Sequence, residues 1–107
     1  MDHGWTPRGT LWVASRLPAS LSSYILNVPA AIRRFLVSGD FEARSDSGAP
    51  CGTVKINDSG TSRGYTNYLS QHGADEGDIL IVEFDLLAKK ASLRLGDDEL
   101  LQEYAPD

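Results

Sequence analysis

The sequence predicts a mainly β protein, in which short strands form an open, barrel-like sheet and two short helices complete the fold. Three observations predict this fold class. Short apolar stretches recur between polar turns along most of the chain, and they do not alternate with helices in the βαβ rhythm of a doubly wound sheet. The run Ile79–Phe84 is too apolar for a strand with one face in water. We expect about seven strands in one sheet.

The strands are predicted from short apolar runs and from alternation of apolar and polar residues. The run Ile79–Phe84 belongs in the centre of the sheet, and it is followed by a turn and by the alternating segment Ala91–Leu95. These two segments predict an antiparallel hairpin in which Leu93 and Leu95 face the core. The other predicted strands are Leu11–Val13, Tyr24–Leu26, Phe41–Arg44 and Gly52–Ile56.

Two short amphipathic helices are predicted, over residues 28–36 and 65–73. Pro29 suits the first turn of a helix because its missing N–H would have no partner there in any case. Gly73 is placed to end the second helix in the left-handed conformation. The apolar faces are Ile32, Phe35 and Leu36 in the first helix and Tyr65, Tyr68 and Leu69 in the second.

The composition indicates a single domain spanning residues 1–107, because 107 residues with 41% hydrophobic content support one core only. Cys51 is the only cysteine, and the two histidines do not form a Cys/His cluster with it at zinc spacing, so we expect no metal or other cofactor. No leader-like or bilayer-spanning segment is evident. We therefore expect a soluble, cytoplasmic protein, and a monomer because no apolar surplus is apparent.

The charge is distributed unevenly along the chain. Residues 1–73 carry a net charge of +2 and residues 74–107 a net charge of −7, which together give the overall −5. A chain of this kind can present a basic face despite its acidic composition. The residues from 96 to 107 form an acidic tail, in which Leu100, Leu101 and Tyr104 are available to dock on the sheet.

Two polar segments rich in Ser, Arg and Asn precede the two predicted helices. The first is Ser15–Asn27 and the second is Lys55–Arg63. Each is flexible by composition and is anchored by a more rigid element, which is how a protein presents a loop to a partner rather than to its own core. We call these segments the first and second arms, and their pairing suggests a pincer.

The order of elements resembles the DNA-binding pseudobarrel family. The similarity covers about residues 10–96 and is carried by the segments VPAAIRRFL, GTVKINDSGTSRGYTNYL and GADEGDILIVEFD. The family includes the B-three domains of plant transcription factors and the N-terminal effector-binding domains of EcoRII-like type IIE restriction endonucleases. The resemblance implies an open seven-stranded pseudobarrel whose two arms grip the major groove of double-stranded DNA around a concave basic surface.

The residue types in the two arms suit DNA contacts. Arg16 and Arg63 have the geometry for guanine, Asn27 or Asn57 for adenine, and Asp58 for the amino group of cytosine. The short hydroxyl side chains suit contacts to phosphate or to base edges, and Arg33 and Arg34 of the first predicted helix suit contacts to the phosphate backbone. A solvated loop position is the alternative interpretation for each side chain. The expected DNA-contacting residues are Ser15, Arg16, Ser20, Ser22, Ser23, Tyr24, Asn27, Arg33, Arg34, Lys55, Asn57, Asp58, Ser59, Thr61, Ser62 and Arg63.

The chain carries no recognisable catalytic constellation. It has no Asp/Glu-x-Lys triplet of a metal-dependent nuclease and no G-x-S-x-G, phosphate-loop or H-E-x-x-H motif. We expect a non-catalytic chain. The resemblance implies the recognition or effector domain of a type II restriction endonuclease that reads a site of the CCWGG type, with a nuclease domain C-terminal to this chain. The alternatives are a stand-alone bacterial transcription regulator and a protein-interaction barrel that binds a basic partner.

Overall fold

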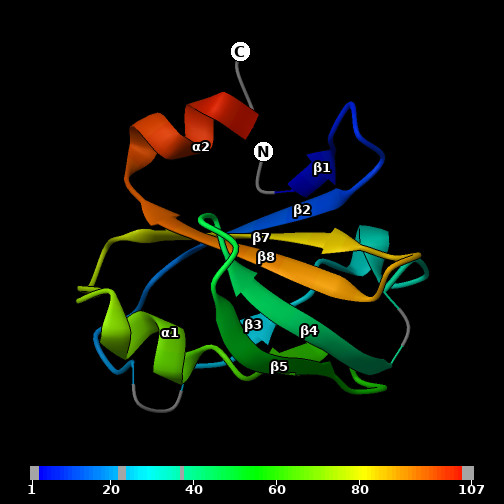
Figure 1. Ribbon diagram of the computed structural model, residues 1–107, viewed down its shortest axis with the longest axis horizontal. Helices are drawn as coiled ribbons and strands as arrows, with labels where there is room; N and C mark the ends of the chain where they lie inside the picture. Colours follow the sequence, from blue (N-terminus) through cyan, green and yellow to red (C-terminus); the bar gives the residue numbers. More distant parts are fainter. Residues whose placement is uncertain (1–2, 22–23, 37, 105–107) are drawn as a thin grey trace.

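A computed structural model describes residues 3–21, 24–36 and 38–104. In this part of the chain the structure is an open, curled sheet of eight strands with two short α-helices (Figure 1). The strand order is β1-β2-β7-β8-β4-β5-β6-β3, and all neighbours are antiparallel except β4 and β8. The elements are β1 His3–Trp5, β2 Leu11–Arg16, β3 Leu26–Asn27, a 3₁₀ turn Ala30–Ile32, β4 Gly39–Ser45, β5 Pro50–Ile56, β6 Thr61–Arg63, α1 Thr66–Gln71, β7 Ile79–Asp85, β8 Lys90–Gly96 and α2 Asp98–Tyr104.

The main core lies inside the curl of the sheet. Alternate residues of each strand point inward, as the pleat requires. Phe41 of β4 and Phe84 of β7 meet edge to face, with ring centroids 5.1 Å apart. α1 closes one end of the curl with its buried residues Tyr68 and Leu69, and the adjoining Tyr65 is fully buried. The predicted apolar face of the second helix and the left-handed Gly73, at φ +64°, are therefore confirmed.

β7 is buried on both faces, as its composition predicts. It lies between β2 and β8, with Leu80, Val82 and Phe84 in the main core. Its other face forms a second apolar cluster, in which Ile79 and Ile81 pack with Trp12 of β2 and Leu100 of α2. The predicted hairpin of β7 and β8 is confirmed by antiparallel pairing from Ile79 opposite Gly96 to Asp85 opposite Lys90.

The first predicted helix is wrong. Residues 28–36 form only a 3₁₀ turn followed by further turns, with bonds from Ile32 N–H to the Pro29 carbonyl and from Phe35 N–H to the Ile32 carbonyl. Ile32 and Leu36 are buried as expected, but Phe35 is 37% exposed. The segment connects β3 to β4, and so short a stretch gains few α-helical bonds for the entropic cost of nucleation.

The described residues form eight strands rather than about seven, because β1 and β6 were not among the six strands named from the sequence; one helix, α2, was not predicted either. β1 and β6 are each three residues long. β1 forms by pairing with β2, and β6 forms by pairing with β5 and β3. α2 lies in the acidic tail and docks through Leu100, with Leu101 and Tyr104 partly buried against the second cluster, so the expected docking is confirmed. No described helix is long and apolar enough to cross a membrane.

Candidate nucleic-acid interface

The two arms are joined in one sheet. Asn27 at the end of the first arm lies opposite Thr61, and the Val28 N–H donates to the Gly60 carbonyl at 2.8 Å. Within the second arm, Lys55 of β5 lies opposite Arg63 of β6. The second arm is therefore largely strand, whereas the described part of the first arm has strand residues only at its two ends, Ser15–Arg16 and Leu26–Asn27.

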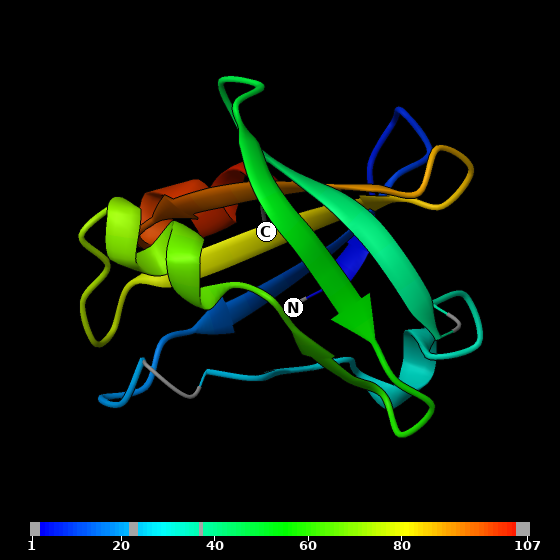
Figure 2. The ribbon, with the colours of Figure 1, turned by 60° about the horizontal axis from the view of Figure 1, so that its bottom comes forward.

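Strand alternation sorts the arm residues into an inner and an outer set. Ile56, Ser62 and Leu26 point inward and are buried. Their neighbours point to the outside of the curled sheet, where three of them are exposed and Thr61 is partly exposed. We call this outer surface the arm face, and it consists of Asn27, Lys55, Thr61 and Arg63. Figure 2 shows the first-arm loop and the β5–β6 turn at opposite ends of the segment that contains β3.

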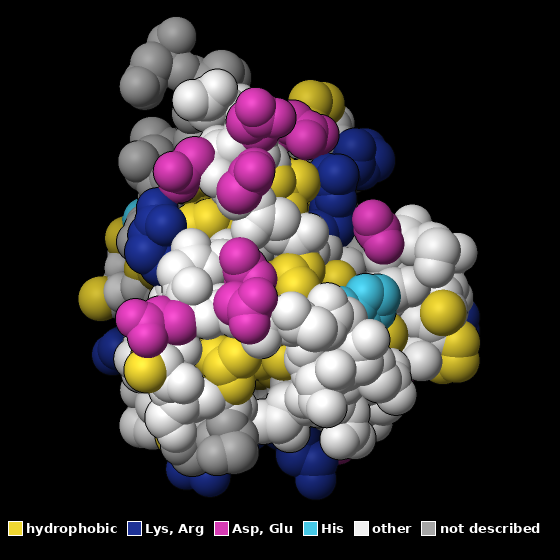
Figure 3. Space-filling model, turned by 90° about the vertical axis from the view of Figure 1, so that its left-hand side faces the viewer, with side chains coloured by type: hydrophobic (Ala, Val, Ile, Leu, Met, Phe, Trp, Pro, Cys, Tyr) yellow, Lys and Arg dark blue, Asp and Glu magenta, His cyan; other side chains and the backbone are white. Residues whose placement is uncertain are grey.

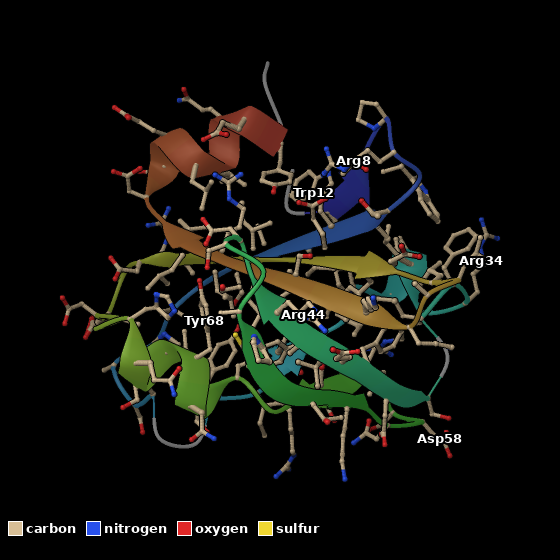
Figure 4. All side chains as sticks on the ribbon, viewed as in Figure 1. Arg8, Trp12, Arg34, Arg44, Asp58 and Tyr68 are labelled. Carbon is tan, nitrogen blue, oxygen red and sulfur yellow. The ribbon has the colours of Figure 1, made fainter. Side chains whose placement is uncertain are left out.

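The turn at residues 57–60 is held by the side chain of Asn57. Its Oδ1 accepts hydrogen bonds from the Ser59 N–H at 3.1 Å, the Ser59 hydroxyl at 2.9 Å and the Thr61 N–H at 3.0 Å. A bidentate contact to adenine requires this oxygen as an acceptor. Asn57 therefore shapes the turn, which leaves Asp58 exposed at its tip (Figure 4).

The Arg33 side chain packs against the same turn. Its Nε donates to the Val28 carbonyl at 3.2 Å, and its side chain lies so close to Gly60 that a Cβ on Gly60 would be 2.4 Å from Nε. Gly60 adopts φ +82°, which a glycine adopts without strain. Arg33 and Asp58 line a shallow hollow of about 300 Å³ beside the turn. Arg33 and Arg34 are both exposed, and Arg34 lies over the Phe35 ring, 4.9 Å from its centroid.

The beginning of the first arm lies beside its end, because Ser15, Arg16 and Asn27 line one hollow of about 370 Å³. Ser15 and Arg16 are the last residues of β2. The Arg16 guanidinium donates to the Gly77 carbonyl at 3.0 Å and to Asp98 of α2 at 2.8 Å. Arg16 is thus bonded to the acidic C-terminal part of the chain, at a hollow that it shares with Asn27 of the arm face. Ser20 is exposed, and Ser22 and Ser23 lie outside the described residues.

Two expected contact residues are corrected, because their side chains lie in the core. Tyr24 is 5% exposed and packs edge to face on Tyr65, with ring centroids 5.9 Å apart. Ser62 is fully buried, and its hydroxyl bonds to the Tyr65 hydroxyl at 2.7 Å. Burial raises the pKa of Tyr24 and of Tyr65, so both phenols remain neutral. Neither Tyr24 nor Ser62 reaches the surface.

Many acidic side chains gather over α2 and the turn that precedes β7, as Figure 3 shows. Lys and Arg side chains lie beside them as well as at the lower rim of the same view. The arm face has acidic neighbours of its own, because Asp40 lies opposite Lys55 on β4 and Asp58 occupies the turn. The acidic surface over α2 and the turn before β7 is thus not the only place where carboxylates are exposed.

Sequence reasoning missed a polar network around Glu83 of β7, on a part of the sheet that does not belong to the arm face. Glu83 is the only charged residue in the otherwise apolar stretch from Ile79 to Phe84, and this interruption was the available signal. Its carboxylate accepts hydrogen bonds from Arg8, Thr10 and Tyr104. Burial alone would raise the pKa of Glu83, but these donors outweigh it and lower the pKa, so Glu83 is ionised.

The described residues include no group of three His, Cys, Asp or Glu side chains that could hold a metal ion. Comparison with family models, with curated proteins and with solved structures gives no match for this chain.

Proposed function

We propose that this protein binds double-stranded DNA sequence-specifically through the arm face and the 57–60 turn. The observation that carries the proposal is the pairing of β3, β6 and β5, which unites polar residues from both arms on one outward surface. Arg63 and Lys55 supply cations there, Asn27 and Thr61 supply uncharged polar groups, and Asp58 projects from the turn. Arg63 has the donor geometry for guanine, and Asp58 accepts from the cytosine amino group.

The arm face has few cations, which sets the expected behaviour. Each phosphate neutralised contributes about 0.9 to the slope of log affinity against log salt. We expect only a modest non-specific affinity and a shallow salt dependence, so base contacts must supply most of the discrimination. The preorganised turn favours this, because its backbone is ordered by Asn57 before any DNA binds.

A selection on random duplexes followed by anisotropy titrations tests the proposal. The parent protein should prefer the selected site over a scrambled duplex, and both complexes should weaken as salt rises. Arg63→Ala should cost about 1–3 kcal/mol on the preferred site and reduce discrimination. Lys55→Ala should weaken both duplexes alike and lower the salt slope by about one unit.

Lys90→Ala is the matched control, because Lys90 is an exposed cation on β8 that lies opposite two acidic residues, Glu42 and Asp85, and belongs to neither arm. It should bind like the parent. If no duplex is preferred, or if Lys90→Ala loses as much affinity as Arg63→Ala, the proposed interface is wrong.

A role as the recognition or effector domain of a restriction endonuclease with a CCWGG-type site remains a narrower proposal, which depends on the family resemblance. A stand-alone bacterial transcription regulator is the alternative of the same class. The selection on random duplexes distinguishes the two, because only the restriction-endonuclease domain requires a CCWGG-type site.

A second candidate function is the binding of a basic protein by the acidic face. The observation in its favour is the concentration of carboxylates over α2 and the turn before β7 in Figure 3. A salt-sensitive complex with a basic peptide, together with the absence of any preferred duplex, would favour this candidate over DNA recognition.

A further inference from the structure

The curled sheet is open between β2 and β3. Among the described residues, β1 pairs with β2 only from Leu11 to Val13, whereas β7 pairs with it as far as Arg16. Residues 14–16 of β2 therefore have a partner strand on one side alone. β3 ends the strand order and pairs only with β6 in the same part of the chain. Figure 2 shows β2 and the segment that contains β3 running beside each other across this opening.

Both strands direct backbone hydrogen-bonding groups into the opening. The Leu17 N–H donates to the carbonyl of the residue before β7 at 2.8 Å, and successive residues of a strand direct these groups to opposite edges. Ala14 and Arg16 therefore direct their N–H and C=O groups away from β7. The Val28 N–H donates to the β5–β6 turn at 2.8 Å, so Asn27 directs its own groups away from β6 in the same way. Strand edges of this kind are templates for pairing with another chain.

The hollow of about 370 Å³ that Ser15, Arg16 and Asn27 line lies in this opening. The other residues that line it are apolar and come from β2, from the segment around β3, from the start of β7 and from α2. Ser15 lies between the buried Val13 and Leu17 along the chain, so its side chain is on the inner side of the sheet. An apolar hollow with a few polar groups is typical of a binding site.

A hydroxyl beside the hollow is buried without a partner. Tyr24, two residues before β3, is 5% exposed, and its hydroxyl makes no hydrogen bond among the described residues. Burial raises the pKa of Tyr24, and the neighbouring hydroxyl of Ser15 opposes part of that rise, so the phenol lies next to the wall of the hollow. A buried polar group without a partner costs free energy, and a ligand that supplies the partner removes this cost.

We propose that this opening accepts one extended peptide segment of a partner protein, which inserts between β2 and β3 and closes the sheet into a barrel. The peptide backbone pairs with Ala14 and Arg16 on one side and with Asn27 on the other. Its side chains point alternately inward and outward. The inward ones are apolar except for one polar side chain, which bonds to the Tyr24 hydroxyl. Main-chain hydrogen bonds give such strand additions their affinity, and contacts to alternate side chains give them specificity.

The two free edges favour a peptide over other occupants. An extended polypeptide supplies N–H and C=O groups alternately to both sides, which is what the two edges require. Every described strand of this chain already pairs within the sheet, so a second folded copy has no strand with two free edges to insert. Duplex DNA has no amide backbone to pair with a strand edge. The site is therefore additional to the arm face and does not depend on DNA binding.

A selection from a displayed library of random peptides of about ten residues supplies the probe, and anisotropy titration of a labelled selected peptide against the full chain measures its affinity. Selected peptides should carry apolar residues at alternate positions. In amide hydrogen exchange followed by NMR, the N–H groups of Ala14, Arg16 and Asn27 should become protected when the peptide binds. A selection that returns no binding peptide, or protection confined to other residues, would refute the proposal.

N-methylation of the selected peptide distinguishes insertion from addition to a single edge. An inserted strand uses the N–H groups of adjacent residues on opposite sides, so methylation at either of two adjacent central positions should weaken binding about fivefold or more, the effect of losing one hydrogen bond. If one of the two positions tolerates methylation, the peptide pairs with one edge only and insertion is wrong. This test leaves the protein itself unchanged, so its result does not depend on the folding of a variant.

Tyr24→Phe tests the buried hydroxyl. The variant should be at least as stable as the parent, because the hydroxyl that it removes has no partner, and it should weaken the peptide about fivefold or more. Ser15→Leu fills the hollow and should block the peptide. Ser92→Leu is the matched control, because it makes the same change at an exposed position of β8 outside the hollow, and it should bind like the parent.

Crossing the variants tests the opening and the arm face separately. Tyr24→Phe should retain duplex binding, and Arg63→Ala should retain the peptide. The proposal is overturned if Tyr24→Phe and Ser15→Leu both bind the peptide like the parent, or if Ser92→Leu loses as much affinity as Ser15→Leu. Ultracentrifugation of the parent without peptide should show no dimer that Ser15→Leu abolishes, because such a dimer would make a second copy the occupant.

Discussion

Gly60→Ala should destabilise the protein by about 1.5–3.5 kcal/mol through two separable costs. Gly60 adopts φ +82°, and an L-residue in the left-handed region costs about 1–2 kcal/mol. The new Cβ would also lie 2.4 Å from Nε and 2.9 Å from Cδ of Arg33. Arg33 must then move and give up its bond to the Val28 carbonyl, which adds about 0.5–1.5 kcal/mol.

A double-mutant cycle with Arg33→Ala separates the two costs. In the Arg33→Ala background the steric cost disappears, so Gly60→Ala should cost only the backbone term of about 1–2 kcal/mol. Urea unfolding followed by circular dichroism measures all four proteins, and the slopes should agree if unfolding remains two-state.

Gly9→Ala is the matched control. Gly9 has the same φ of +82°, but nothing lies within 4 Å of its Cβ position, so only the backbone cost applies. If Gly60→Ala costs no more than Gly9→Ala, or costs the same with and without the Arg33 side chain, then Arg33 does not support the turn as described.

Three further predictions concern the core and the acidic side. Ser62→Ala should cost about 1–3 kcal/mol in urea unfolding because it leaves the Tyr65 hydroxyl buried without its partner, and the double variant with Tyr65→Phe should cost less than the sum of the single changes. Glu83 has a folded-state pKa below its ordinary value of 4.5. The stability that ionised Glu83 contributes is therefore present above pH 4.5 and is lost as the pH falls through the folded-state pKa. In a plot of melting temperature against pH, Glu83→Gln should make the decline on the acid side shallower. Arg16→Ala should change stability by less than about 0.5 kcal/mol, because its ion pair is exposed, and should leave duplex affinity unchanged; a large loss of affinity would mean that Arg16 exchanges its carboxylate partner for DNA.

The parts of the fold that could be predicted are those with a strong local pattern. The run Ile79–Phe84 predicted a strand covered on both faces, and the structure supplies the main core on one side and α2 on the other. The alternation in Ala91–Leu95 and the turn before it fixed the hairpin in the same way. In both cases the burial pattern follows directly from residue periodicity.

The missed strands have no such pattern. β1 consists of His3, Gly4 and Trp5, and β6 consists of Thr61, Ser62 and Arg63, so neither shows an apolar run. Both become strands because neighbouring strands offer them hydrogen-bond partners, which is a property of the sheet rather than of the segment. The same long-range pairing makes most of the second arm strand and pairs the two ends of the first arm.

Composition located the polar arms but not the partners of individual side chains. Asn57, Arg16, Tyr24 and Ser62 are residue types that suit DNA, yet each is engaged within the protein. Asn57 holds the turn, Arg16 contacts α2, and Tyr24 and Ser62 lie in the core. Local side-chain bonds such as those of Asn57 compete with any external role, and they depend on a backbone geometry that the sequence alone does not specify.

The acidic tail has a structural function that its composition conceals. Ile79, Ile81 and Trp12 form an apolar surface on the outside of the sheet, and Leu100 of α2 covers it. A helix that buries one face in this way must keep its other face charged to remain hydrated. α2 carries three carboxylates, Asp98, Glu99 and Glu103, which supply part of the net negative charge, while Lys55 and Arg63 of the arm face are exposed. Part of the acidity of the chain therefore belongs to the helix that covers the outer face of β7.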